Sequence, residues 1–336
     1  MIKKPSGDKQ VKQVNVLSLF DGLSCGQLAL QRANIPVENY LASEIDKYAI
    51  QVTQKNFPYT IQLGDITEIG TRRIERMEEL GIDLIIGGSP CQDLSFAGKG
   101  KGLKKGTRSN LFFEFVKILK AIKPKYFLLE NVRMKKENQD IISEYMGVEP
   151  IAINSNLVSA QNRNRLYWTN IPFTIPDDKG IILADIIEEG ITDREKSHCL
   201  DANYFKGGNL KSYFEKHRRQ LVFNEFLPNT LPNKSATRDG KAYALTYSYP
   251  GAVAWNSIER KQRTMIPFCR SDEEDNPNVV EGYHYRKLTP IECERLQTVP
   301  DNYTGGVSNT QRYKMLGNGM TVDVIAHILK GIKADD

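Results

Sequence analysis

The sequence predicts an α/β protein, with an open, doubly wound, mostly parallel sheet and a second, smaller and irregular lobe. From Val14 to about Val132, short apolar runs rich in Val, Ile, Leu and Phe alternate with helical patterns. These runs show little polar alternation, which is typical of strands buried on both faces of a parallel sheet. After Trp168 the alternation stops, and residues 172–284 are rich in Asn, Lys, Tyr and Pro. We expect the second lobe to cover that range.

Five apolar runs are the expected strands, and a helix is expected between the last two. The strand candidates, in chain order, are VNVLSLF, YLASEID, TIQLGDI, DLIIGG and YFLLENV. The segment SNLFFEFVKILKAI repeats apolar residues at helical spacing and ends before Pro124. Right-handed β-α-β crossovers join such elements, and ligands bind beyond the carboxyl ends of the strands. Later candidates are the strand AYALTYSY and the helical patterns TPIECERLQTV and GMTVDVIAHILKGI.

The composition indicates a soluble protein of a reducing compartment. The 336-residue chain has ordinary apolar and charged fractions, and we expect neither a membrane span nor a leader peptide. Its five cysteines never form a Cys-x-x-Cys pair, and only four histidines are present. That pattern argues against a zinc site and a disulfide framework, so no metal ion is expected. The polar, Lys-rich residues 1–13 are expected to form a flexible segment.

Positive charge is concentrated in three places, although the net charge of +5 is mild. A glycine-rich loop, residues 99–108, carries five basic side chains and no acid, and further clusters lie at 206–219 and 260–270. Basic runs are usually solvated surface, but three of them with interleaved Tyr and Phe favour a phosphate backbone as partner. The basic residues of the loop are Lys99, Lys101, Lys104, Lys105 and Arg108.

A reactive cysteine and an acid are expected at one edge of the sheet. Cys91 comes directly after Pro90, where an apolar run ends. A cysteine thiol has an ordinary pKa of about 8.5, and basic neighbours or a helix N-terminus increase its thiolate fraction. Glu130 ends the run YFLLENV at the same sheet edge, where it could act as a proton donor. Taken alone, the two residues also fit a packed cysteine and a solvated strand end.

A nucleoside pocket is also expected at this edge. The segment FDGLSCG, from Phe20 to Gly26, follows the first expected strand and opens a helix, whose N-terminal N–H groups favour a carboxylate or phosphate. Glu44 ends the second strand, where it could accept hydrogen bonds from a ribose, and Asp65 ends the third. The G-x-G-x-x-G fingerprint is absent, and an ordinary strand-to-helix turn is the alternative interpretation.

Together these residues favour attack on an electron-poor heteroaromatic ring, whose nitrogen is protonated as the nucleophile adds. Arg163 and Arg165 lie two residues apart on the extended segment QNRNRLYW, and therefore on one face. A surface strand with two exposed arginines is the alternative for that segment. A cysteine peptidase fits poorly, because no His or Asn stands at a persuasive position to act as its base.

Eight ordered motifs resemble those of the DNA (cytosine-5) methyltransferase family, from Val14 to Ile332. The whole set is specific, whereas PC or ENV alone would mean little. GGSPCQDLS and the tail GVSNTQRYKMLGNGMTVDVI also resemble the vertebrate de novo branch. The regulatory domains of that branch are lacking, so the chain is more similar to a bacterial or phage modification enzyme. The motifs are FDGLSCG, Glu44 in SEID, GDI, SPCQ, ENV, QNRNR, RKLTPIECERLQTVPDNY and GNGMTVDVI.

The resemblance implies an S-adenosylmethionine-dependent methyltransferase fold with the cofactor at the strand ends. Phe20 would lie against the adenine, Glu44 on the ribose and Asp65 at the adenine amino group. Ser24 stands where the family usually has a glycine, and Gly319 where it usually has an alanine, so details of the pocket differ there. The residues implied to bind the cofactor are Phe20, Asp21, Gly22, Glu44, Ile45, Asp65, Ile66, Pro90, Asn318 and Met320.

The resemblance also implies the reaction. Cys91 would attack carbon 6 of a cytosine flipped out of duplex DNA, while Glu130 hydrogen-bonds ring nitrogen 3 and the exocyclic amine. Arg165 would bind the cytosine carbonyl, with Arg163 supporting the closed loop or the base. Carbon 5 would take the methyl group and then lose its proton as Cys91 leaves. The implied DNA contacts are Gln92, Ser95, Lys99, Lys101, Lys104, Lys105, Arg108, Thr230 and Leu231.

The implied organisation is a catalytic domain of residues 14–171 and 285–336, with a target-recognition domain at 172–284. The loop 99–108 would close over the DNA and is expected to be mobile without it. The implied partner is double-stranded DNA, with a cognate restriction endonuclease as a further partner. The enzyme is expected to be a monomer in the cytoplasm of a bacterial cell, encoded by a chromosome or a phage.

Three alternatives remain open from the sequence. RNA cytosine methyltransferases share the catalytic motifs but usually have a Phe where Gln92 stands. An inactive DNA-binding relative would usually lack one of Cys91, Glu130 and Arg165, and all three are present. A relative of thymidylate synthase would attack a pyrimidine through cysteine without needing the eight motifs. The sequence therefore favours a DNA (cytosine-5) methyltransferase.

Overall fold

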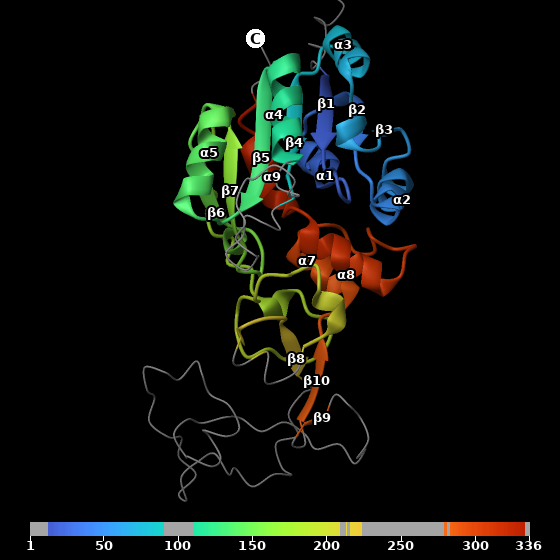
Figure 1. The fold of residues 1–336 in the computed structure, drawn as a ribbon. Helices are drawn as coiled ribbons and strands as arrows, with labels where there is room; N and C mark the ends of the chain where they lie inside the picture. The colour runs from blue at the N-terminus through green and yellow to red at the C-terminus, as the bar shows by residue number, and fades with distance from the viewer. Residues whose placement is uncertain are drawn as a thin grey trace, which may run out of the picture.

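The computed structural model describes residues 13–90, 111–208, 213, 216–223, 279–280 and 283–332. Figure 1 shows a main lobe built on one large sheet, drawn at the top, and a much smaller sheet that lies below it. The helices α7 (Pro290–Leu296) and α8 (Asn309–Asn318) lie between the two sheets. The predicted α/β class, with a second and smaller lobe, is confirmed.

The main sheet has seven strands in the order β3-β2-β1-β4-β5-β7-β6. Only β7 runs antiparallel to its neighbours, β5 and β6; the remaining pairs are parallel. The carboxyl ends of β1, β2, β4 and β5 therefore meet at one edge, as predicted. The strands are β1 (Val14–Leu19), β2 (Val37–Ser43), β3 (Ile61–Gln62), β4 (Leu84–Gly87), β5 (Tyr126–Val132), β6 (Ile151–Asn154) and β7 (Asn164–Thr169).

Helices cover both faces of this sheet because successive strand residues are apolar on both sides. Leu84 and Leu128 pack with one set of helices, and their neighbours Ile85 and Leu129 pack with the other. Burying one such side chain contributes about 1.5–3 kcal/mol, so each face is held firmly. One face carries α1 (Cys25–Arg32), α2 (Lys47–Asn56) and α9 (Val322–Leu329); the other carries α3 (Thr71–Leu80), α4 (Leu111–Ile122) and α5 (Lys136–Met146).

The C-terminal helices α7 and α9 complete the main lobe, although they are distant in the sequence from its first strands and helices. α9 packs directly against α1, and Arg32 forms an ion pair with Asp323. Thr289 caps α7 by accepting a hydrogen bond from the backbone N–H of Glu292, whose side chain in turn accepts one from the backbone N–H of Thr289. This capping box, with Pro290 in the first turn, explains why the predicted helix at TPIECERLQTV begins there.

The smaller sheet has the order β8-β10-β9, with antiparallel pairing. Its strands are β8 (Leu221–Phe223), β9 (Val279–Val280) and β10 (Tyr283–Lys287). Four short 3-10 helices complete the description: η1 (Ile66–Glu68), η3 (Ser155–Leu157), η4 (Leu183–Asp185) and η5 (Tyr204–Lys206). The strand candidate AYALTYSY lies outside the described residues. Within the described ranges, no helix is long and apolar enough to cross a membrane, and no group of three potential metal ligands occurs.

Candidate active site

The turn after β1 has an unusual backbone. Phe20, Gly22 and Ser24 all have positive φ angles, of 59°, 60° and 63°. Such angles are ordinary for glycine but uncommon for Phe and Ser, so the surrounding contacts must stabilise them. A Cβ atom at Gly22 would meet nothing within 4 Å, which leaves the turn open on that side. The turn therefore has both an uncommon backbone conformation and an open side at Gly22.

Glu44 fixes this turn from the end of β2. One carboxylate oxygen accepts a hydrogen bond from the Gly22 N–H at 2.8 Å. The other accepts from the N–H groups of Ile45 and Asp46, both at 2.8 Å. Glu44 thus links the glycine turn to the start of α2, and its role at a ribose stays a prediction.

The neighbouring residues place an apolar surface and a second acid at the same edge. The Ile45 side chain is 72% exposed, which is unusual for a large apolar residue beside a strand end. Oδ1 of Asp65 accepts hydrogen bonds from the N–H and hydroxyl groups of Thr67, both at 2.9 Å, and so caps η1. By contrast Ile66, also predicted to touch the cofactor, is only 4% exposed and packs in the core.

Asp21 is buried beneath the turn, with one carboxylate oxygen left unpaired among the described residues. Its Oδ1 accepts a hydrogen bond from the Tyr40 hydroxyl at 2.8 Å, whereas Oδ2 has no partner there. Burial raises the pKa of Asp21 from 3.8 to about 6, and the nearby hydroxyl groups of Ser18, Tyr40 and Ser24 offset part of this rise. Ionising an acid in this state is costly for the stability of the fold.

The raised pKa gives a testable dependence of stability on pH. Between about pH 4 and pH 6 the folded protein retains a proton that the unfolded chain releases, so the free energy of unfolding falls as the pH rises through this window. Above it, the cost of the ionised carboxylate stays constant. We expect Asp21→Asn to raise the free energy of unfolding at pH 8 by up to about 3 kcal/mol, and by progressively less towards pH 4. Urea unfolding at several pH values measures this; a gain that is independent of pH would contradict it.

Two C-terminal residues reach the same region through α8. Asn318 is the last residue of α8 and is exposed, whereas Met320 is 7% exposed. The Cys25 thiol, at the start of α1, donates a hydrogen bond to the Met320 carbonyl at 3.2 Å. Burial raises the pKa of this thiol to about 12, so Cys25 is a structural cysteine and not a nucleophile.

The acid and the arginine predicted to bind the target base form an ion pair. Nε of Arg165 lies 2.9 Å from Oε1 of Glu130, and their side chains are only 13% and 11% exposed. Pairing of β5 with β7 places them, with Glu130 opposite Tyr167 and Arg165 opposite Val132. Both residues therefore come from neighbouring inner strands, and the low exposure of the Arg165 side chain excludes the alternative of a surface strand with exposed arginines at that position.

β4 ends against this pair. A Cβ atom at Gly88 would lie 3.3 Å from Oε2 of Glu130, so the chain passes close to the carboxylate. Asn131 donates hydrogen bonds to the Ser89 hydroxyl at 3.1 Å and to its carbonyl at 3.3 Å. The sequence had singled out Glu130 alone in ENV; Asn131 now has a role as well, because it fixes the backbone just before Pro90.

Arg163 and Arg165 both approach Cys199, which the sequence analysis did not single out. Nη1 of Arg163 lies 3.5 Å from its Sγ atom, and Nη2 of Arg165 lies 4.0 Å from it. Burial by neighbouring atoms raises the pKa of the Cys199 thiol, but the two guanidinium charges outweigh this, and the pKa falls below its ordinary value. Because Cys199 is exposed, solvent screening limits the effect. No local sequence pattern signals this contact.

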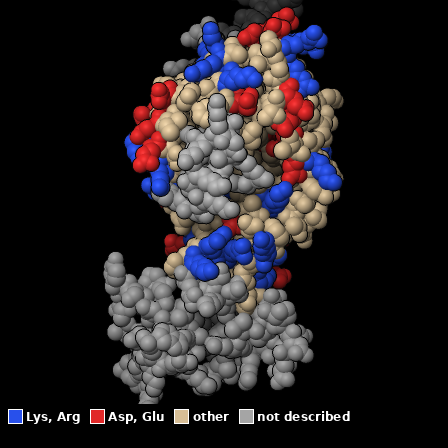
Figure 2. Space-filling model, viewed as in Figure 1, with Lys and Arg blue, Asp and Glu red and all other residues tan. Residues whose placement is uncertain are grey.

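The predicted nucleophile and the predicted DNA contacts lie outside the described residues. They are Cys91, Gln92, Ser95, Lys99, Lys101, Lys104, Lys105, Arg108, Thr230 and Leu231. The expected mobility of the loop 99–108 therefore stays a prediction. Pro90 is described and half-buried, as the last residue before that stretch. Figure 2 shows Lys and Arg side chains gathered on the described part of the chain just below the main lobe.

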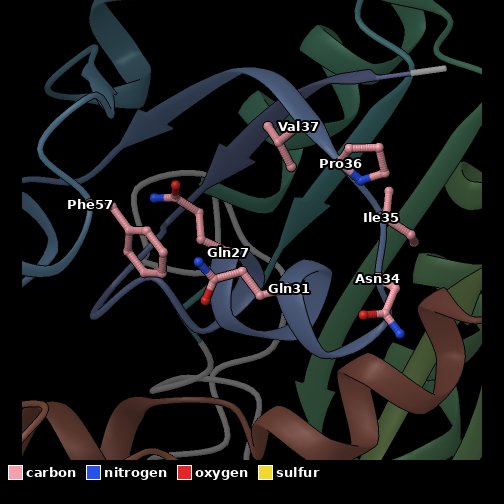
Figure 3. A pocket seen from close by; sticks show the side chains of 7 residues that line it. All are labelled: Gln27, Gln31, Asn34, Ile35, Pro36, Val37 and Phe57. Atoms are coloured by element: carbon pink, nitrogen blue, oxygen red, sulfur yellow. The ribbon is translucent and has the colours of Figure 1, made fainter. Parts of the chain in front are cut away.

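A hollow of about 610 Å³ lies away from these residues, beside α1 and the start of β2. Figure 3 shows Gln27 and Gln31 of α1 on one side, with Phe57 and Val37 on others. No residue of the site described above lines it, and it opens near the amino-terminal end of β2 instead of the carboxyl end. We therefore assign the chemistry to the strand ends and not to this hollow.

The seven-stranded, mostly parallel sheet with helices on both faces is the fold of the S-adenosylmethionine-dependent methyltransferases. Solved structures with this fold include DNMT2 from Spodoptera frugiperda, with a TM-score of 0.60 and 20% identity, covering 95% of this chain and 99% of that one. The methyltransferase EhMeth from Entamoeba histolytica has a TM-score of 0.64 and 17% identity, with coverages of 95% and 98%. At these identities the likeness concerns the fold.

The family follows from sequence comparison. The family model of the C-5 cytosine-specific DNA methylases matches residues 14–334, and the chain belongs to this family. The type II methyltransferase M.HpaII from Haemophilus parainfluenzae is 30% identical over 334 residues, which cover 92% of this chain and 86% of that protein. The orphan methyltransferase M.SPRI from Bacillus phage SPR is 25% identical, with coverages of 95% and 97%. The protein is a DNA (cytosine-5) methyltransferase, as the sequence predicted, and the alternative functions are not favoured.

Proposed function

We propose that the protein transfers a methyl group from S-adenosylmethionine to carbon 5 of a cytosine flipped out of duplex DNA. The observation that carries the proposal is the buried Glu130–Arg165 pair beside the end of β4, directly before Pro90 and Cys91. The Glu130 carboxyl group, once it is protonated, and the Arg165 guanidinium, 2.9 Å away in the structure, suit the N3–C2 carbonyl edge of cytosine, which offers two adjacent acceptors.

The cofactor fits the opposite side of the same sheet edge. The open turn at Gly22, the carboxylates of Glu44 and Asp65 and the exposed Ile45 side chain suit a nucleoside with an apolar ring and two ribose hydroxyls. The unpaired oxygen of the buried Asp21 suits a cationic group. When bound, S-adenosylmethionine supplies a methyl group on a sulfonium. The proposed binding residues are Phe20, Asp21, Gly22, Glu44, Ile45, Asp65, Ile66, Pro90, Asn318 and Met320, with Ile66 acting from the core.

Four residues of the chain would each have a separate role in the reaction. The Cys91 thiolate adds to carbon 6, while Glu130 donates a proton to ring nitrogen 3 and Arg165 binds the carbonyl oxygen. This makes carbon 5 nucleophilic, so that it accepts the methyl group. Loss of the carbon 5 proton to solvent water then restores the double bond between carbons 5 and 6, Cys91 leaves as the thiolate, and the proton on ring nitrogen 3 returns to Glu130. Asn131 keeps the segment before Cys91 in place through its two bonds to Ser89.

The wider organisation is part of the proposal. We assign residues 14–171 and 285–336 to catalysis, and residues 172–284, with Thr230 and Leu231, to recognition of the DNA sequence. Gln92, Ser95 and the basic side chains of the loop 99–108 would contact the DNA and offset the cost of flipping the base. We further propose a monomeric enzyme of the bacterial cytoplasm, whose functional partner is a restriction endonuclease of the same specificity where the host encodes one.

Base-resolution sequencing of 5-methylcytosine in a plasmid tests the function. The plasmid is taken from cells that express the protein, beside cells that express Cys91→Ser. We expect methylation at one short motif, absent in the control, which would also identify the recognition sequence. An unmethylated plasmid, from soluble protein that binds S-adenosylmethionine, would contradict the proposal, and transfer to tRNA would then be measured.

A further inference from the structure

Arg163 points into the protein and donates hydrogen bonds to three backbone carbonyls in two separate segments. Its side chain belongs to an alternating segment in which Gln161 and Arg163 are 0% and 2% exposed, whereas Asn162 and Asn164 face solvent. Nη2 donates to the carbonyls of Gly319 and Gly317, at 2.8 and 3.2 Å, and Nη1 donates to the Leu200 carbonyl at 3.0 Å. The guanidinium thus joins the C-terminal end of α8 to the loop around Leu200.

The two joined segments are also packed as closely as backbone allows. A Cβ atom at Gly317 would lie 2.3 Å from the carbonyl carbon of Asp201 and 2.4 Å from the nitrogen of Ala202. Gln161 accepts a hydrogen bond from the Leu200 N–H at 3.0 Å, so both backbone groups of Leu200 are bound by this one segment. A shift of α8 near Gly317 must therefore move the 199–202 loop with it.

A continuous series of contacts leads from there to the base-binding pair. Arg163 reaches the Cys199 thiol at 3.5 Å, Arg165 reaches the same thiol at 4.0 Å, and Arg165 pairs with Glu130. At one end lie Gly319 and its neighbours Asn318 and Met320, and at the other lies the carboxylate of Glu130. The series spans the distance between the two halves of the site.

A purely structural role accounts poorly for this side chain. Nε of Arg163 is buried without a partner among the described residues, and a buried charged group with an unsatisfied donor destabilises a fold. An apolar side chain would fill the same space at lower cost. The planar guanidinium donates to three carbonyls at once from two nitrogen atoms, and the single ammonium group of a lysine could not reproduce this geometry.

We propose that Arg163 is a positioning residue that couples the cofactor side of the site to the target-base side. It touches neither ligand. Instead it keeps the Gly317–Met320 segment and the 199–202 loop in one relative position, and through Cys199 it sets Arg165 against Glu130. The inference rests on the proposed roles of Asn318 and Met320 at the cofactor and of Arg165 at the cytosine. Binding of either ligand should then strengthen binding of the other.

Calorimetry on Arg163→Lys tests the coupling. The probe is S-adenosylhomocysteine, titrated with and without a short duplex that carries the motif found by plasmid sequencing. We expect the duplex to strengthen its binding to the unsubstituted protein by about tenfold, and hardly at all in the variant. The matched control is Arg312→Lys. Arg312 lies on α8 and is also largely buried, but it bonds to Glu294 and Thr304 and not to the segments that Arg163 joins.

Each outcome bears on the proposal. Lost coupling in Arg163→Lys but not in Arg312→Lys supports it. Equal losses in both variants, no coupling in the unsubstituted protein, or a slower methyl transfer with intact coupling would overturn it. Failure of the proposed function is distinguishable, because the unsubstituted protein would then methylate no DNA and yield no motif.

Cys199→Ala gives a second test that does not risk the fold, because Cys199 is exposed. We expect this variant to bind S-adenosylhomocysteine normally in the absence of DNA, and to transfer methyl groups about tenfold more slowly at saturating substrates, since Arg165 loses one neighbour on its Cys199 side. An unchanged turnover rate, with unchanged coupling, would exclude the contact through the thiol.

Discussion

Glu130→Gln is expected to lower the turnover number for methyl transfer by about 10²- to 10⁴-fold, the range that positioned proton donors contribute. The amide has nearly the same shape as the carboxyl group but cannot deliver a proton to ring nitrogen 3. It also removes the negative charge that lies 2.9 Å from Arg165, in a site where both side chains are nearly buried. Single-turnover transfer of a labelled methyl group to the plasmid-derived duplex measures the effect.

Glu114→Gln is the matched control for that experiment. Glu114 lies on α4 and pairs with Lys117 at 3.3 Å, but both side chains are substantially exposed. We expect it to change the rate little, because exposed ion pairs contribute little. A rate for Glu130→Gln within a few fold of the unsubstituted enzyme would remove Glu130 from the chemistry and leave it a purely structural role.

The largest expected loss of stability comes from Glu294→Ala. Glu294 is 0% exposed and pairs with Arg312 at 2.9 Å; its carboxylate also accepts hydrogen bonds from the N–H groups of Asn302 and Thr304, at 2.7 and 2.8 Å. The substitution removes the acceptor of a largely buried guanidinium, of the buried Thr304 N–H and of the Asn302 N–H. Breaking a buried pair in this way costs about 3–5 kcal/mol in free energy of unfolding.

Urea unfolding, with Asp301→Asn as control, checks this prediction. Asp301 pairs with Arg295 at 2.6 Å on the surface, where its side chain is 46% exposed. We expect the control to lose less than about 1 kcal/mol. If both variants were equally stable, the polar group around Glu294 would not be what fixes the loop between α7 and α8.

The parallel part of the sheet could be predicted because its strands are apolar on both faces. The same reasoning could not predict where QNRNRLYW would pair. β7 lies antiparallel between β5 and β6. Its position depends on pairing with strands that are distant in the sequence, which a local pattern does not reveal. The helix α8 was also missed, since NTQRYKMLGN mixes polar and apolar residues without a clear stripe, and its packing against α7 and η5 stabilises it. The strand expected at TIQLGDI is only two residues long.

The candidate site shows the same division between local and long-range information. Glu44, Asp65 and Glu130 could be located from sequence, because residues at the ends of parallel strands meet at one edge. Asn131, Gln161 and Cys199 could not, since their roles depend on contacts with chain segments whose positions only the folded protein defines. Arg163 was predicted as a site residue, but the orientation of its side chain was not. Alternation along the segment predicted that it lies on the same face as Arg165, whereas its guanidinium donates to the carbonyls of Leu200, Gly317 and Gly319.

The packing of α9 against α1 has a consequence for how the enzyme is made in the cell. Contacts such as Cys25 with Met320 and Arg32 with Asp323 join residues 295 and 291 positions apart. During translation, the apolar surface of α1 and of the sheet face that α9 covers stays exposed until the ribosome has released the last helices. The nascent chain is then exposed to aggregation, and a chaperone that shields this face would raise the yield. If Asn318 and Met320 hold the cofactor as proposed, a partly synthesised enzyme lacks part of that pocket and cannot methylate DNA before synthesis is finished.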